Sequence, residues 1–288
     1  MNTRRFLLLL NRAVVGAFND NCFEIAKSAA YSSVLSFFPG LMVVASLLFR
    51  QTVVTKAVID DIAEALGRVL PPESYRLAAQ FLTVRGARTV GLLAGAWFIA
   101  IWSASNVVLA LVEGFRVAYR IPTPRPLVRA RVVGLALLAL SGVPLLAATL
   151  LLLFGQQIEN WLLANLREVS DLVRLAGHAL RWVLSLGTSV LVIGLLYHLG
   201  PNRPQRWRFV WPGAVLATVL WLPATLLFAW YVKNVARYRD LYGSISTAVV
   251  LLIWMYLVNL IVMIGCEFNA EHERLETEAE KRRELSGL

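Results

Sequence analysis

Six apolar blocks of about 20 residues each constrain the fold of this chain more than any other feature. An α-helix rises about 1.5 Å per residue, so a block of that length crosses a bilayer core about 30 Å thick. The chain has 288 residues and is only 16% charged, whereas a soluble domain carries about a quarter charged residues. The sequence therefore predicts an all-α integral membrane protein. The six predicted transmembrane helices cover residues 25–49, 90–112, 132–154, 182–199, 209–232 and 244–266.

The membrane domain takes up most of the chain, at residues 25–267, and leaves no room for a sizeable soluble domain. Residues 1–24 have a basic start and a short apolar run without a clear small-residue cleavage site, which predicts an interfacial helix rather than a cleaved signal. Residues 268–288 are predicted to form a solvated helical tail. Two long loops, at 51–88 and 156–181, carry apolar residues at helical spacing, so each is expected to hold an amphipathic helix that packs at the interface or roofs a cavity.

Lysine and arginine in the loops predict the orientation. With the N-terminus inside, most of the 28 basic residues lie in cytoplasmic segments, including the dense runs at 121–131 and 201–213. Both termini are then cytoplasmic, and the two long loops are periplasmic. Cys22 and Cys266 lie near the reducing face, as expected of free thiols. The net charge of +10 is explained by this rule, so we expect no nucleic acid as a partner.

Polar side chains recur at helical spacing in the first, second and sixth predicted transmembrane helices. Ionisable groups at membrane depth are costly and usually face a protein interior or a water-filled cavity. We therefore expect a substrate or proton pathway among these helices. The alternative is that each acid only ends its helix at the headgroups and that the asparagines bond between helices. The pathway candidates are Asp20, Glu24, Lys27, Tyr31, Asn106, Glu113, Asn259, Glu267 and Asn269.

Two further sets of residues are candidates for helix bending and for anion contact. Pro39 and Gly40 lie within the first predicted transmembrane helix and Gly243 precedes the sixth, where each could form a kink or part of a gate. Arg237 and Arg239 lie beside tyrosines in the last loop. They could hold an anionic ligand near a helix N-terminus, or simply contact lipid headgroups.

Motifs for catalysis and cofactor binding are missing from the sequence. It contains no P-loop, no nucleophile elbow and no two-histidine zinc signature, and its three histidines lie in separate segments. Two cysteines have no metal-site spacing. The sequence therefore predicts no enzyme activity, no catalytic residue, no metal and no cofactor.

Four stretches, taken in order, resemble the YihY/BrkB family of bacterial inner-membrane proteins. They are SAAYSSVLSFFPG, YHLGPNRPQRWRFVWPGAVLATVLW, YGSISTAVVLLIWMYLVNLI and GCEFNAE. The resemblance covers about residues 20 to 272 and implies six transmembrane helices with cytoplasmic ends. The family's usual Gly-Ala-Glu is Gly265-Cys266-Glu267 here. The family once carried the label ribonuclease BN, but the chain lacks the acidic or histidine metal cluster that a nuclease needs.

The resemblance implies a role in the bacterial envelope, with transport of a lipid or other amphiphile. We therefore expect a transporter or flippase of an anionic amphiphile, with a polar cleft between the first, second and sixth transmembrane helices. Its inner gate would consist of Glu24, Lys27, Glu113 and Glu267. The expected partners are membrane lipids. A second copy of the chain or another envelope protein is a further possible partner. The alternatives are a membrane scaffold or assembly factor, a channel and a membrane-embedded hydrolase.

Overall fold

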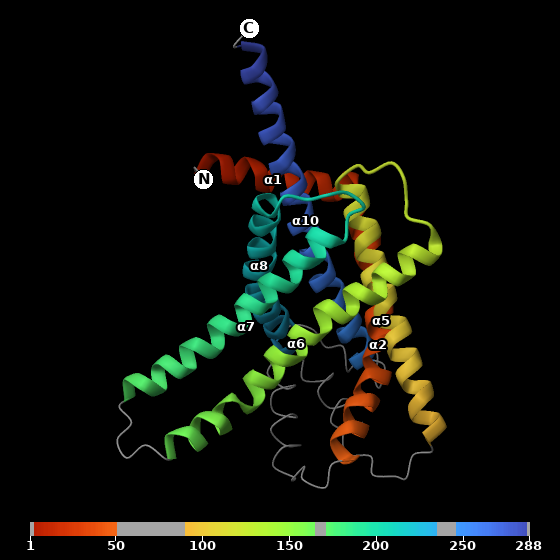
Figure 1. The fold of residues 1–288 in the computed structure, drawn as a ribbon, viewed down its shortest axis with the longest axis vertical. Coiled ribbons are helices and arrows are strands. Elements are labelled where there is room, and N and C mark those ends of the chain that lie inside the picture. Colours follow the sequence, from red (N-terminus) through yellow and green to blue (C-terminus); the bar gives the residue numbers. More distant parts are fainter. Residues whose placement is uncertain (1–2, 51–89, 165–170, 235–245, 287–288) are drawn as a thin grey trace.

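Every element in the described residues, 3–50, 90–164, 171–234 and 246–286 of a computed structural model, is an α-helix (Figure 1). This agrees with the predicted all-α class. In chain order the helices are α1 (Thr3–Asn19), α2 (Cys22–Arg50), α5 (Val90–Ala118), α6 (Leu127–Ala164), α7 (Asp171–Leu199), α8 (Trp207–Asn234) and α10 (Ser246–Ser286).

Five of these helices are long and apolar enough to cross a membrane. They correspond to the second to sixth predicted transmembrane helices. The first predicted transmembrane helix coincides with the 29-residue α2, whose side chains from residue 42 onward lie outside the described part, so its crossing stays a prediction. The five apolar stretches are Ala94–Ala118, Leu127–Ala148, Ala179–Leu199, Trp207–Asn234 and Ala248–Ser286.

The long loops differ from the prediction where the structure describes them. α6 continues without a break through Ala164, and α7 already begins at Asp171. The predicted separate helix at 156–181 is therefore replaced by extensions of the two neighbouring transmembrane helices. Of the apolar residues that predicted it, Ile158, Trp161 and Leu162 are helical, but they continue α6. The other loop, 51–88, lies outside the described residues.

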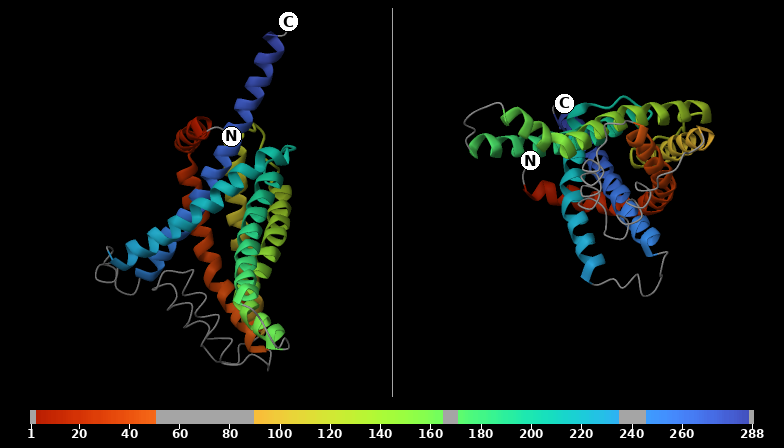
Figure 2. Two further views of the ribbon diagram at one scale, coloured as in Figure 1. Left: turned by 90° about the vertical axis from the view of Figure 1, so that its left-hand side faces the viewer. Right: turned by 90° about the horizontal axis from the view of Figure 1, so that it is seen from below.

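The two ends of the chain lie at the same end of the molecule, which we call the terminal end (Figure 1). There α1 runs across the bundle rather than along it, and the last part of α10 projects beyond the other helices (Figures 1 and 2). α2 packs along α5, while α10 contacts both this pair and α8. α10 is therefore the helix that joins the two sides of the bundle.

A sharp turn between α1 and α2 positions the acidic residues at the terminal end. Asn21 has a φ of 54°, in the left-handed region that asparagine tolerates better than most residues. Its carbonyl accepts a hydrogen bond from the backbone N–H of Glu24, at 3.0 Å, in the first turn of α2. α1 itself is fixed by burial of Leu9 and Ala13 against α10, with the rings of Phe6 and Phe268 5.7 Å apart.

α8 and α10 cross closely at two glycines. A Cβ added to Gly265 would lie 2.7 Å from the carbonyl oxygen of Gly213 and 2.5 Å from the hydroxyl of Tyr197. Tyr197 in turn donates a hydrogen bond of 2.6 Å to the carbonyl of Val262. Small residues permit such close approach of membrane helices. This contact fixes α10 against α8 just before Glu267.

Candidate functional site

Glu267 has the most unusual environment of the predicted site residues. Its side chain is 0% exposed, although it ends the apolar part of α10. One carboxylate oxygen, Oε1, accepts a hydrogen bond from the thiol of Cys22 at 3.5 Å. The other oxygen, Oε2, has no donor within the described residues. A buried carboxylate with half of its hydrogen-bonding capacity unused is costly, which marks this position as a candidate site.

A second carboxyl, that of Asp20, lies close enough to Glu267 for its charge to act on it. Two ionised carboxylates are both acceptors and cannot bond to each other. A hydrogen bond between Asp20 and Glu267 would therefore require a proton on one of the two groups. Asp20 comes from the turn after α1 and Glu267 from α10, so a shared proton would join two segments far apart in the chain.

Three small or sulfur-containing neighbours enclose this acid pair. A Cβ added to Gly16 of α1 would lie 3.0 Å from Oε2 of Glu267, so the absence of a side chain there makes room for the carboxyl. Cys22 and Cys266 are both free thiols and both fully buried. Their thiols supply little polarity to stabilise a negative charge. A positive charge that acts on Glu267 is that of Arg274, about two turns further along α10.

Asn269, two residues from Glu267, has full hydrogen bonding instead. Its Oδ1 accepts from the backbone N–H of Gly213 at 2.7 Å, and its Nδ2 donates to the carbonyl of Val210 at 2.8 Å. Pro212 lies between these two residues inside α8, and a proline removes one backbone donor from a helix. Asn269 thus bonds the backbone of α8 beside this proline and holds α10 against it.

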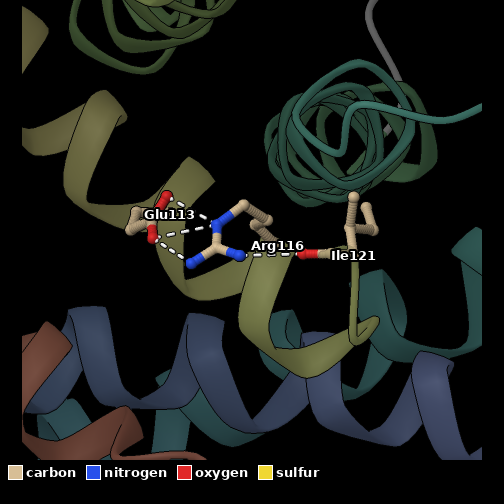
Figure 3. A network of polar contacts seen from close by, with 3 residues as sticks. All are labelled: Glu113, Arg116 and Ile121. Atoms are coloured by element: carbon tan, nitrogen blue, oxygen red, sulfur yellow. Dashed lines mark hydrogen bonds and ion pairs between the residues drawn. The ribbon is translucent and has the colours of Figure 1, made fainter. Parts of the chain in front are cut away.

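Glu24, Lys27 and Glu113, the other members of the predicted gate, form local ion pairs. Lys27 donates to Glu24 at 2.7 Å, and both side chains are largely exposed. Arg116 donates from Nη2 to Glu113 at 2.6 Å and from Nη1 to the carbonyl of Ile121 at 2.8 Å, as Figure 3 shows. Within the described residues, no ion pair or hydrogen bond joins these groups to Glu267.

The two predicted mid-helix asparagines form hydrogen bonds, either to a neighbouring helix or within their own helix. Asn259 is buried and donates to the carbonyl of Met255 at 2.7 Å and to the hydroxyl of Ser33 on α2 at 3.4 Å. Asn106 accepts from Arg131 of α6 at 2.8 Å. The guanidinium of Arg131 also lies 3.9 Å from the ring centroid of Trp102. Interhelical hydrogen bonds of this kind stabilise membrane helix packing.

The remaining candidates lie farther from the acid pair or outside the described residues. Tyr31 is 63% exposed on α2. Pro39 lies inside α2, and a Cβ added to the adjacent Gly40 would meet nothing within 4 Å. Arg237, Arg239 and Gly243 lie outside the described residues.

Gly16 and the contact of Cys22 with Glu267 were not among the residues predicted from the sequence. Both belong to the N-terminal part of the chain, where residues 1–24 were assigned to an interfacial helix. The spacing Gly16-Asp20 of four residues places the two on one helical face and was a usable signal. That this face meets Glu267 depends on the turn at Asn21, which helical periodicity does not indicate.

Comparison with known proteins gives a consistent set of relatives. The family model described as "Virulence factor BrkB" matches residues 13–286. The "Putative ribonuclease-like protein YfkH" of Bacillus subtilis is 34% identical over 248 residues, which cover 85% of this chain and 88% of the relative. A "UPF0761 membrane protein" of Tolumonas auensis is 29% identical over 280 residues, covering 94% and 86%. No solved structure matches.

The word "ribonuclease-like" in one relative's name raises the question of metal-dependent hydrolysis. Within the described residues, no group of three or more His, Cys, Asp and Glu side chains is arranged to hold a metal ion. The acid pair and the nearby Cys22 do not form such a group. The described part of the chain therefore offers no observation that favours a metal-dependent nuclease.

Proposed function

Because the chain belongs to the virulence factor BrkB family and is a multi-pass helical membrane protein, we propose that it is a proton-coupled transporter or flippase of a lipid or other anionic amphiphile. The observation that carries this proposal is the fully buried carboxyl of Glu267, which has one oxygen without a donor in the described residues and lies near the carboxyl of Asp20. An ionisable group inside a membrane protein is a functional candidate by default, and a pair of acids that shares one proton is a recurring device for proton transfer.

The acid pair suits proton coupling because its two members come from different parts of the bundle. With one proton shared, the carboxyls attract each other and hold the turn after α1 against α10. Loss of that proton leaves two like charges close together, one of them buried, which favours separation of the two segments. Binding and release of one proton would thus shift the bundle between a closed and an open arrangement.

A polar stripe on α2 supports an amphiphile as the substrate. Glu24, Lys27 and Tyr31 share one helical face, and all three are largely exposed on a helix that is otherwise apolar. Lys27 lies near Tyr256 of α10, a helix that α2 packs against. A headgroup could move along this stripe while its acyl chains stay in the bilayer.

The direct test is transport by the purified full-length protein in lipid vesicles with fluorescent phospholipids, with and without a pH gradient. We expect lipid movement between leaflets that increases with the gradient and that Glu267→Gln abolishes. Glu113→Gln is the matched control, because it removes an exposed carboxylate whose partner within the described residues is Arg116 of the same helix, α5. Wild-type protein without movement of any lipid, or full activity in Glu267→Gln, would contradict the proposal.

A membrane scaffold or assembly factor is the second candidate function. It is favoured by the C-terminal part of α10, which continues as a charged helix and is exposed from Thr277 to Ser286 (Figure 2). Such an extension could dock a partner. A stoichiometric partner that is retained on purification and lost on deletion of residues 277–288, together with no lipid movement, would favour this function.

We also propose that both termini are cytoplasmic and that the host membrane is the bacterial inner membrane. The shared position of the two ends at the terminal end supports the first part, and the basic runs near that end support the orientation (Figure 1). Fusion of a reporter that is active only in the cytoplasm to the C-terminus should give signal. Signal from a reporter that is active only outside would contradict this orientation.

A further inference from the structure

A pocket of about 300 Å³ lies at the terminal end, apart from the acid pair. It is formed where α10 passes the end of α5 and the segment that connects α7 to α8. Neither Asp20 nor Glu267 lines it. The polar residues of its lining on which the argument rests are Tyr119, Arg203, Glu273, Arg274, Glu278 and Lys281.

Two buried donors at this pocket have no acceptor. Tyr119 is only 7% exposed, and its hydroxyl has no hydrogen-bond partner within the described residues. The same holds for Nε of Arg203, whose Nη2 is paired with Glu273. The guanidinium of Arg203 lies 4.6 Å from the centroid of the Tyr119 ring. Ring and ion pair together fix the guanidinium, while its Nε and the tyrosine hydroxyl are left to be satisfied by something else.

The charges around the pocket favour an anion. Three basic side chains, those of Arg203, Arg274 and Lys281, line it, against two acidic ones, Glu273 and Glu278. Glu273 is already paired with Arg203. Arg274 is held by Glu271 and by the carbonyl of Ala118. Lys281 is exposed and has no partner within the described residues, so it can turn toward a ligand.

We propose that this pocket binds a phosphate group through the hydroxyl of Tyr119, Nε of Arg203 and the ammonium of Lys281. A phosphate carries several acceptor oxygens and so satisfies a neutral hydroxyl and two cations at once. The phosphate can belong to a lipid headgroup or to a soluble phosphate compound, which share this chemistry. The proposal does not depend on transport, because neither Asp20 nor Glu267 lines the pocket.

The test is calorimetric titration of the full-length protein in detergent with two probes, inorganic phosphate and short-chain phosphatidic acid. Tyr119→Phe keeps the ring under Arg203 but removes the hydroxyl, and we expect it to weaken binding about tenfold, the effect of one hydrogen bond to a charged group. Lys281→Gln should weaken binding about threefold, as expected for an exposed ion pair. Arg282→Gln is the matched control, since Arg282 is also exposed and does not line the pocket.

The two probes separate the sources of the phosphate. Binding of phosphatidic acid alone assigns the pocket to a lipid headgroup, and binding of inorganic phosphate alone assigns it to a soluble compound. Binding of both, with the same loss in Tyr119→Phe and Lys281→Gln and none in Arg282→Gln, supports phosphate recognition in general. Absence of binding by either probe at millimolar concentration overturns the proposal. Unchanged binding in both Tyr119→Phe and Lys281→Gln also overturns the proposal. Because Lys281 is exposed, Lys281→Gln is expected to leave the fold intact and remains a valid test if Tyr119→Phe does not fold.

Discussion

Glu267 and Asn269 lie two residues apart on α10 and are both 0% exposed, yet their surroundings are opposite in kind. Asn269 faces α8, where its two polar atoms each meet a backbone partner at hydrogen-bonding distance. Glu267 faces Asp20 and Cys22, where one oxygen has no donor within the described residues. Burial alone therefore does not distinguish a structural polar group from a functional one. The two side chains differ instead in their hydrogen bonds, and four substitutions can break or sharpen this contrast.

Gly265→Ala should have the largest effect, because it acts on the contact that holds the α8 side in place. The added Cβ would lie 2.7 Å from a backbone carbonyl, that of Gly213, which cannot move without its helix. We expect a loss of stability of about 3 kcal/mol or more, seen as aggregation in gel filtration or a lowered melting temperature. Gly187→Ala in α7, whose Cβ would meet nothing within 4 Å, should be neutral or slightly stabilising. Equal melting of both variants would contradict the close crossing.

Asn269→Ala should be the next most harmful. It leaves the N–H of Gly213 without its acceptor and removes the donor to Val210. The expected loss is about 2 kcal/mol, measured as a lower thermal unfolding midpoint in detergent. Asn234→Ala is the control, since Asn234 is an exposed asparagine that bonds only the carbonyl of Trp230 in its own helix. A control that unfolds as early as Asn269→Ala would show that the clamp between the helices contributes nothing.

Glu267→Gln should not lower the stability as Asn269→Ala does, although Glu267 is as buried as Asn269. The amide has nearly the same shape and adds an N–H₂ donor that can meet the carboxylate of Asp20. We expect unchanged stability or a gain of about 1 kcal/mol, together with loss of transport. The same thermal unfolding assay checks the first part. A loss as large as that of Asn269→Ala would mean that Glu267 is a structural residue, and the contrast would fail.

Glu113→Gln should have the smallest effect. Glu113 is exposed and pairs only with Arg116, which keeps its hydrogen bond to the carbonyl of Ile121. Exposed ion pairs contribute less than about 1 kcal/mol, so a shift near the error of the unfolding assay is expected. A large shift would indicate that this end of α5 supports the site.

Much of the fold follows from the sequence, because a bilayer requires long apolar helices. Five of the predicted transmembrane helices are present, and each extends beyond its predicted bounds at one end or both, as with α6, which reaches Ala164. Helix length is harder to predict, since apolar residues continue past the membrane without a break. For the same reason the loop helix expected at 156–181 became part of α6 and α7.

The site was harder to predict than the fold. Periodicity indicates which residues share a helix face, and it correctly grouped Glu24 with Lys27. It does not indicate which helix that face meets, so Glu267 was grouped with Glu113 rather than with Asp20 and Cys22 alone. The ion pair of Glu113 and Arg116 is local, and a spacing of three residues in a helix is enough to predict it. The position of Asp20 beside Glu267 depends on the turn after α1, where one residue, Asn21, is left-handed.

The central claim is that Asp20 and Glu267 share a proton, and infrared spectroscopy of the reconstituted protein tests it most directly. A protonated carboxyl has a carbonyl absorption that an ionised carboxylate lacks. We predict such a band in the wild-type protein at neutral pH, its loss in both Glu267→Gln and Asp20→Asn, and its persistence in Glu113→Gln. A wild-type protein without the band, or a band that survives both single substitutions of the pair, would contradict the account.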